Sequence, residues 1–148
     1  MDTSTAVATL NDLIETCRDG ENGFRAAAGA IKDHHVKGLF ERYARQRGQM
    51  ARELEEQVGR LGGTAATSGT TSGALHRGWM NMKSLVTGSD EAAIIAEAER
   101  GEDVAKSAFE KALAGGSLPA GARELVEQQA AIVRTTHDEV RALERKHP

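Results

Sequence analysis

Two segments of the chain repeat one pattern of apolar residues, and in each segment a single glutamate interrupts the pattern at the same place. The apolar residues recur at alternating steps of four and three, which places them on one face of a helix. The aligned pairs are Leu13 and Ile94, Ile14 and Ile95, Cys17 and Ala98, Gly20 and Gly101, Glu21 and Glu102, Phe24 and Ala105, and Ala28 and Phe109. The repeat predicts two equivalent amphipathic helices in related halves of one fold.

The glutamates of the repeat, Glu21 and Glu102, fall where a helical bundle would normally place leucine. A carboxylate that faces a core costs several kcal/mol unless it is paired, protonated or bound to a cation. A pseudo-twofold axis between the two halves would bring both carboxylates close together in the interior. Large and small residues also exchange places between the segments, as facing layers that interdigitate would need.

Helical spacing continues through most of the chain, which has two prolines and only 3% aromatic residues. The residues 64–73 carry no side chain able to build a core and predict a surface loop. Asp33 and either Ser89 or Asp90 are expected to cap helices, and glycine pairs follow two predicted helix ends. The predicted helices are 5–31, 34–61, 74–87, 90–114 and 119–145. We therefore predict an all-α four-helix bundle, with two helical hairpins joined by a long crossover that contains a short helix, in a single domain 1–148.

Charge and composition argue against several classes of partner. The charged fraction is 28% and the net charge is -3, without the basic footprint of a nucleic-acid-binding protein. No run of 18 apolar residues and no basic leader with an apolar stretch occurs, so we expect no membrane partner. Cys17 is the single cysteine and lies on an apolar face, as a buried thiol would. These features favour a cytoplasmic protein.

The pair of glutamates meets one requirement of a di-metal bundle. Such bundles place one Glu on each of two helices and a Glu-x-x-His pair on each of the other two. His137 lies at a usable height on the last helix, but the residue three positions before it is Arg134 rather than glutamate. Carboxylates with imidazole suit iron or manganese. The candidate ligands are Glu21, Gln49, Glu53, Glu99, Glu102 and His137.

A structural interpretation of the same residues stays open beside the metal site. The two glutamates could be satisfied by ion pairs or hydrogen bonds within the bundle, or could share a proton. His137 could be a boundary histidine bonded to a neighbour, and Glu99 a surface charge. The available partners for the glutamates are Arg18, Tyr43, Arg47 and Arg100.

Five segments resemble a known family, the bacterial proteins described as a ferritin-like four-helix bundle, domain of unknown function 2383. The segments are LNDLIETCRDGENGF at 10–24, GALHRGWMNMK at 73–83, EAERGED at 97–103, QQ at 128–129 and HDEVRAL at 137–143. The resemblance implies a ferritin-like bundle, linked by name to stress responses, with no established activity. Glu21, Glu102 and His137 match polar positions that recur in the family, and Asp103 and Asp138 follow two of them as partners.

Two functions remain in competition at this point. The first is a metal-binding bundle that holds iron or manganese and, if it is an enzyme, acts as a di-metal carboxylate oxidase or ferroxidase. The second is a non-enzymatic structural or interaction module with a metal-free polar core. A homodimer is also expected, because Trp79, Met82 and Val86 offer an apolar stripe beyond what four core faces need. A tryptophan on such a helix more often covers the core of its own chain, which is the alternative for Trp79.

Overall fold

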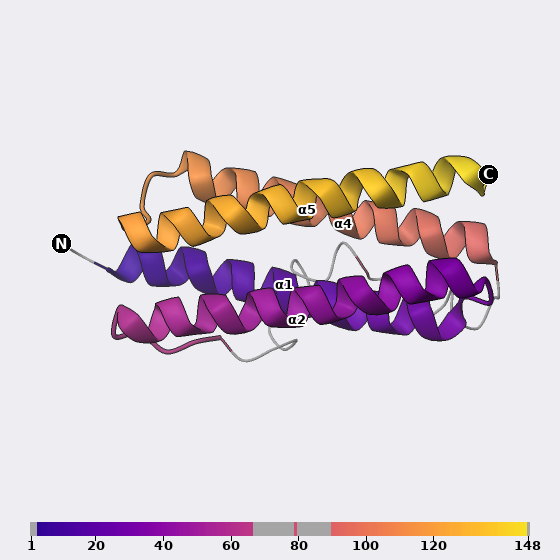
Figure 1. Cartoon of the computed structure of the whole chain (residues 1–148). Helices are drawn as coiled ribbons and strands as arrows, with labels where there is room; N and C mark the ends of the chain where they lie inside the picture. The colour runs from indigo at the N-terminus through magenta and orange to yellow at the C-terminus, as the bar shows by residue number, and fades with distance from the viewer. Residues whose placement is uncertain (1–2, 67–78, 80–89, 148) are drawn as a thin grey trace.

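The computed structural model describes residues 3–66, 79 and 90–147 as four long helices packed side by side (Figure 1). The helices are α1 (Ser4–Ala30), α2 (His34–Arg60), α4 (Glu91–Ala114) and α5 (Ala120–Lys146). Each begins and ends within one residue of its predicted bounds, and the four-helix bundle is confirmed. The predicted short helix 74–87 lies outside the described residues except for Trp79. In the described part of the chain, no helix is long and apolar enough to cross a membrane.

The helix ends follow the expected local chemistry. The Asp33 carboxylate accepts hydrogen bonds from the backbone N–H groups of His35 (2.9 Å) and Val36 (3.2 Å), and Asp90 caps α4 in the same way. Beyond the ends of α2 and α4, Gly62 and Gly116 have φ values of 79° and 69°, which glycine adopts without strain. These residues mark the start of α2 and α4 and the chain turns that follow them.

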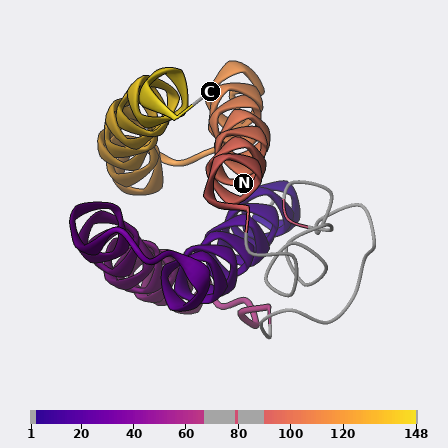
Figure 2. The ribbon, with the colours of Figure 1, turned by 90° about the vertical axis from the view of Figure 1, so that its right-hand side faces the viewer.

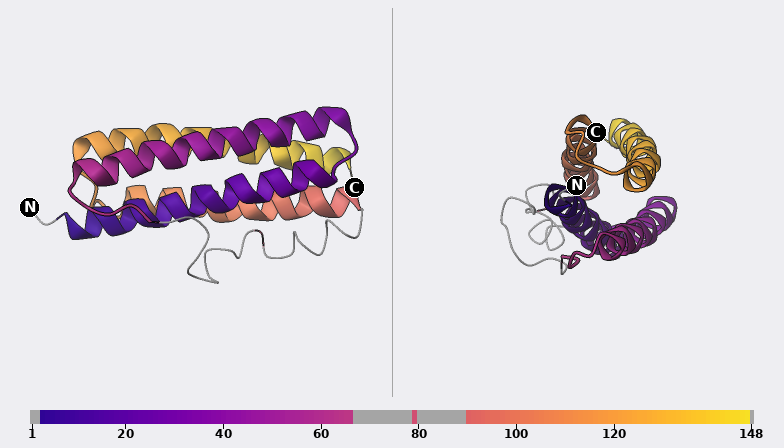
Figure 3. Two further views of the ribbon diagram at one scale, coloured as in Figure 1. Left: turned by 90° about the horizontal axis from the view of Figure 1, so that it is seen from below. Right: turned by 90° about the vertical axis from the view of Figure 1, so that its left-hand side faces the viewer.

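The two hairpins form two layers, with α1 beside α4 and α2 beside α5 (Figures 2 and 3). Helices α2 and α5 approach each other least closely of the four neighbouring pairs. Polar side chains bridge their seam: the Tyr43 hydroxyl donates to Glu139 at 2.6 Å, and the Thr136 hydroxyl donates to Gln46 at 3.2 Å. The Gln129 amide donates to the Met50 carbonyl at 3.2 Å.

Buried apolar residues form two clusters, one toward each end of the bundle. Phe24, Phe40 and Ile94 belong to one cluster, whereas Ala105 and Phe109 belong to the other. Phe24 and its counterpart in the repeat, Ala105, therefore pack in different clusters. Helices α1 and α4 run antiparallel, so the two segments of the repeat follow the bundle in opposite directions (Figure 1).

Trp79 packs against the cluster that contains Phe24, so it covers the core of its own chain. Its ring centroid lies 4.9 Å from that of Phe24, with the planes at 68°. Met82 and Val86 lie outside the described residues, and the homodimer stays a prediction.

Candidate functional site

The buried carboxylate of Glu102 is bound by an arginine on the opposite hairpin. Nη1 of Arg47 donates to Oε1 of Glu102 at 2.7 Å, and Nη2 donates to Oε2 at 2.5 Å. The exposed fractions of the two side chains are 1% and 0%. A bidentate arginine–carboxylate pair of this kind satisfies both oxygens and cancels the charge. The guanidinium therefore stands at the interior position where the metal hypothesis places a cation.

A glycine of the repeat makes room for this ion pair. A Cβ added at Gly20 would lie 3.3 Å from Nη1 and 3.4 Å from Cγ of Arg47, tighter than most real contacts. The guanidinium carbon also lies 5.7 Å from the centre of the Phe24 ring, within the range of a cation–π interaction. Cys17 is buried nearby, and burial raises the pKa of its thiol to about 12. The expectation of a buried, unreactive thiol agrees with this environment.

Glu21, the second glutamate of the repeat, is bound by other arginines. Its carboxylate accepts hydrogen bonds from Arg18 at 2.9 Å and Arg25 at 3.2 Å, both on its own helix. A Cβ at Gly48 of α2 would overlap the Glu21 carboxylate, so α2 leaves space for it there. The two glutamates thus bind different arginines, and each has an ion-pair partner that the structural interpretation expected.

The two candidates on the second helix also have partners of their own. The Gln49 side chain is exposed and accepts a hydrogen bond from Arg52 at 2.9 Å. Glu53 accepts one from the Gln129 amide at 3.1 Å, across the α2–α5 seam. Among the described residues, the one group of three possible acidic, histidine or cysteine ligands contains neither Glu53, Glu21 nor Glu102.

That group consists of Glu99, Asp103 and His137, whose potential ligand atoms all lie within 4.8 Å of one another. Glu99 and Asp103 are four residues apart on α4, so they share one helix face, and His137 reaches them from α5. The exposed fractions of the His137 and Asp103 side chains are 5% and 57%. The structure thus brings two of the predicted ligands, Glu99 and His137, together with a residue predicted only as a partner.

Both ring nitrogens of His137 face carboxylates. Nε2 lies 2.6 Å from Oδ1 of Asp103, and Nδ1 lies 3.1 Å from Oδ1 of Asp138. Burial of the ring opposes its protonation, but the hydrogen bonds to Asp138 and Asp103 more than offset burial and raise the pKa of His137. Asp138 therefore occupies the partner position that the sequence predicted.

The surroundings of the cluster carry an excess of negative charge. Desolvation, a hydrogen bond with Glu144 and the charge of Asp103 together raise the pKa of Glu99. Lys106 is close enough to His137 to oppose the protonation of its ring. The carboxylates of Glu99, Asp103 and Asp138 thus gather about one imidazole, and Glu144 contacts Glu99. Such an arrangement attracts cations.

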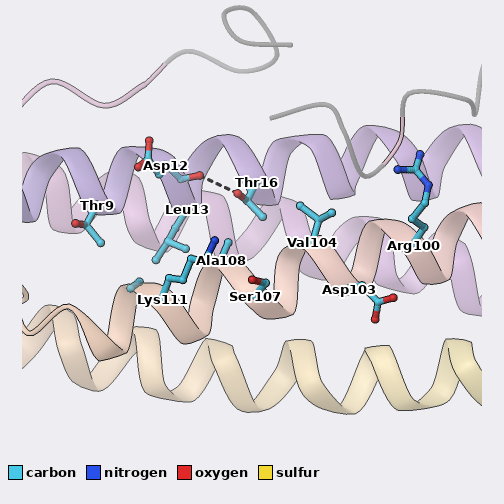
Figure 4. Close-up of a pocket in the computed structure, with 11 residues that line it drawn as sticks. Thr9, Asp12, Leu13, Thr16, Arg100, Asp103, Val104, Ser107, Ala108 and Lys111 are labelled. Atoms are coloured by element: carbon cyan, nitrogen blue, oxygen red, sulfur yellow. Dashed lines mark hydrogen bonds between the residues drawn. The ribbon is translucent and has the colours of Figure 1, made fainter. Parts of the chain in front are cut away.

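A groove of about 840 Å³ runs between α1 and α4 and reaches the edge of this cluster (Figure 4). Hydroxyl groups of Thr9, Thr16 and Ser107 line it, beside apolar Val104. Asp103 belongs both to the groove lining and to the cluster, and Figure 4 shows its carboxylate turned away from α1. The cluster is open to solutes at Asp103, whose side chain is 57% exposed.

Sequence reasoning placed His137 at the right height but missed its contact with Asp103, as well as the contribution of Glu144. The signal that could have found Asp103 is its spacing from Glu99, since residues four apart on a helix share a face.

Comparison with known proteins adds the family but no activity. A family model described as Domain of unknown function (DUF2383) matches residues 5–115. No curated protein matches the chain.

Proposed function

The chain belongs to this family of unknown function, and we propose that it binds one divalent metal ion, manganese or ferrous iron, between Glu99, Asp103 and His137. The observation that carries the proposal is the meeting of three donor groups from α4 and α5 at one point. One nitrogen and two carboxylate oxygens form a donor set that suits these ions. The exposure of Asp103 leaves coordination positions for water or a substrate.

The orientation of His137 supports this ligand role. A metal-binding histidine typically donates its second ring N–H to a carboxylate, which fixes the tautomer and turns the other nitrogen toward the metal. Nδ1 of His137 has such a partner in Asp138, at 3.1 Å. Nε2 and the Asp103 oxygen, now 2.6 Å apart, would need to separate to about 3.0–3.4 Å to sit around one ion at metal–ligand distances of about 2.1 Å. A small rotation of the exposed Asp103 side chain supplies that change.

An interior di-metal centre has less support than this peripheral site. The Arg47 guanidinium neutralises Glu102 and occupies the space beside it. A second cation there would meet like-charge repulsion in a poorly solvated interior. The proposed site is therefore mononuclear, and oxidase chemistry that needs two metals has no second site among the described residues.

Metal titration of protein purified without a histidine tag and treated with chelator tests the proposal. A ligand that binds only the native state stabilises it by RT ln(1 + [L]/Kd), about 2.7 kcal/mol at a hundredfold excess over Kd. For a domain of this size, we expect manganese to raise the melting temperature by about 5–10 °C. Asp103→Asn and His137→Gln should abolish the rise, and Asp138→Asn should weaken affinity about 10–100-fold.

Two further variants separate this site from its alternatives. Glu110→Gln removes an exposed carboxylate from the same helix and should leave metal affinity unchanged. Glu102→Gln should destabilise the fold without changing metal affinity, whereas an interior site predicts a loss of binding. If manganese, ferrous iron and zinc all leave the wild-type melting temperature unchanged, the metal site does not exist.

The second candidate function is a non-enzymatic structural or interaction module with a metal-free polar core. The closed Arg47–Glu102 pair favours it, because this pair satisfies the interior carboxylate without an ion. On this alternative, His137 is an ion-pair partner that joins α4 to α5. The absence of any metal response would leave this as the function that the geometry supports.

A further inference from the structure

The indole ring of Trp79 rests directly on the backbones of two helices. A Cβ added at Gly23 of α1 would lie 2.7 Å from Cε2 of the ring, and one added at Gly101 of α4 would lie 2.7 Å from Nε1. Other ring atoms are closer still to both positions. Both glycines are buried. The ring therefore fits between α1 and α4 only because neither position carries a side chain.

The ring of Phe24 on α1 forms the third side of this slot, whose other sides are the backbones at Gly23 and Gly101. The Phe24 ring meets the indole edge to face, with centroids 4.9 Å apart and planes at 68°. This arrangement is one that aromatic pairs prefer, beyond the gain from the buried area. Two glycine backbones that leave no room for a Cβ and one aromatic ring in edge-to-face contact form surroundings that suit a planar aromatic group.

All parts of the slot belong to α1 and α4, whereas the ring comes from the connection between α2 and α4. We propose that the slot is a binding site for a planar aromatic ring of the size of indole, and that Trp79 occupies it as a tethered ligand. The tether gives Trp79 a high effective concentration, so a free ring competes poorly while Trp79 is present. Trp79 then attaches its part of the connection to the bundle through a side chain that a free ring can replace.

Tryptophan fluorescence tests the slot in the otherwise unchanged protein, because Trp79 is the single tryptophan of the chain. Gly101→Ala and Gly23→Ala should expel the ring. Its emission should then move toward that of the unfolded protein, and its quenching by acrylamide should rise several-fold, with the helical circular dichroism retained. Gly29→Ala is the matched control, because a Cβ at this position of α1 meets nothing within 4 Å. Unchanged emission and quenching in Gly101→Ala would overturn the proposal.

Binding of free indole tests the ligand class. Trp79→Ala should bind indole with a Kd of about 0.1–1 mM, a range reached by small apolar ligands. Wild type should bind it at least about tenfold more weakly, because the slot is filled. Adding Gly101→Ala to Trp79→Ala should abolish the binding. Folded Trp79→Ala that binds no indole would refute the proposal; if this variant does not fold, the fluorescence of the glycine variants decides.

Discussion

Replacing Glu102 with glutamine tests how strongly the buried ion pair holds the two hairpins together. Glutamine keeps the length of the side chain and one acceptor oxygen, but it removes the charge that faces Arg47. The Arg47 side chain is only 1% exposed, and its Nε already has no hydrogen-bond partner within the described structure. No other acceptor therefore stands ready to replace the lost carboxylate oxygen.

The expected loss follows from leaving a guanidinium buried without its counter-ion. Breaking a buried ion pair by removing one partner costs about 3–5 kcal/mol, and a whole domain is stable by only about 5–15 kcal/mol. With a urea dependence of about 2 kcal/mol per M, the midpoint of unfolding should fall by about 2 M. Urea titration followed by circular dichroism at 222 nm, a standard helix wavelength, measures this shift.

An exposed ion pair of similar length is the matched control. Arg60 donates to Glu56 at 2.6 Å, with exposed fractions of 65% and 63%, so Glu56→Gln should change stability by less than about 0.5 kcal/mol. Removing both buried charges in Arg47→Met with Glu102→Leu should recover most of the stability that Glu102→Gln loses. A loss below about 1 kcal/mol in Glu102→Gln, or a double variant no more stable than the single one, would refute the reasoning.

Three further outcomes follow from individual contacts. The raised pKa of His137 means that its protonated ring stabilises the fold at pH values below about 6.5, and that this stabilisation is lost as pH rises through the raised value. Metal-free wild type should therefore show a higher urea midpoint at pH 5.5 than at pH 8.5. The difference between the two midpoints should be smaller in His137→Gln. Cys17 is buried and its pKa is about 12, so a thiol reagent at pH 8 should label it only after unfolding; fast labelling of native protein would contradict its burial. Tyr43→Phe deletes the 2.6 Å hydrogen bond to Glu139 and should lower the free energy of unfolding by about 1 kcal/mol, as measured by urea titration. An unchanged free energy of unfolding would show that this bond does not stabilise the contact between α2 and α5.

The periodicity of the sequence was sufficient to find the helices and their buried faces. Steps of three and four fix which residues face inward, and caps such as Asp33 fix where a helix starts. Arg47 was correctly assigned to a buried stripe on this basis. Arg47 was also among the candidate partners of the two glutamates, but its pairing with Glu102 was not singled out. The longitudinal register between two hairpins and the direction of a long side chain do not follow from the pattern of one helix.

The contact of His137 with Asp103 rather than Glu102 has a simple geometric cause. Successive residues of a helix point about 100° apart. Glu102 points from α4 toward Arg47 in the other hairpin, so the next residue, Asp103, turns toward α5 and reaches His137. A shift of one residue thus moved the histidine's partner from the interior to a surface cluster.

The polar seam between α2 and α5 has a consequence for how the bundle fluctuates. The two hairpins meet more closely through α1 and α4, while the opposite edge depends on side-chain hydrogen bonds such as those from Tyr43 and Thr136. Each such bond contributes only about 1 kcal/mol, and water can replace it. A partial opening of this edge, with α1 and α4 still in contact, would break these hydrogen bonds and would also separate Arg47 of α2 from Glu102 of α4. The buried ion pair therefore opposes the opening, and amide hydrogens that face the seam exchange through it only when both kinds of contact break.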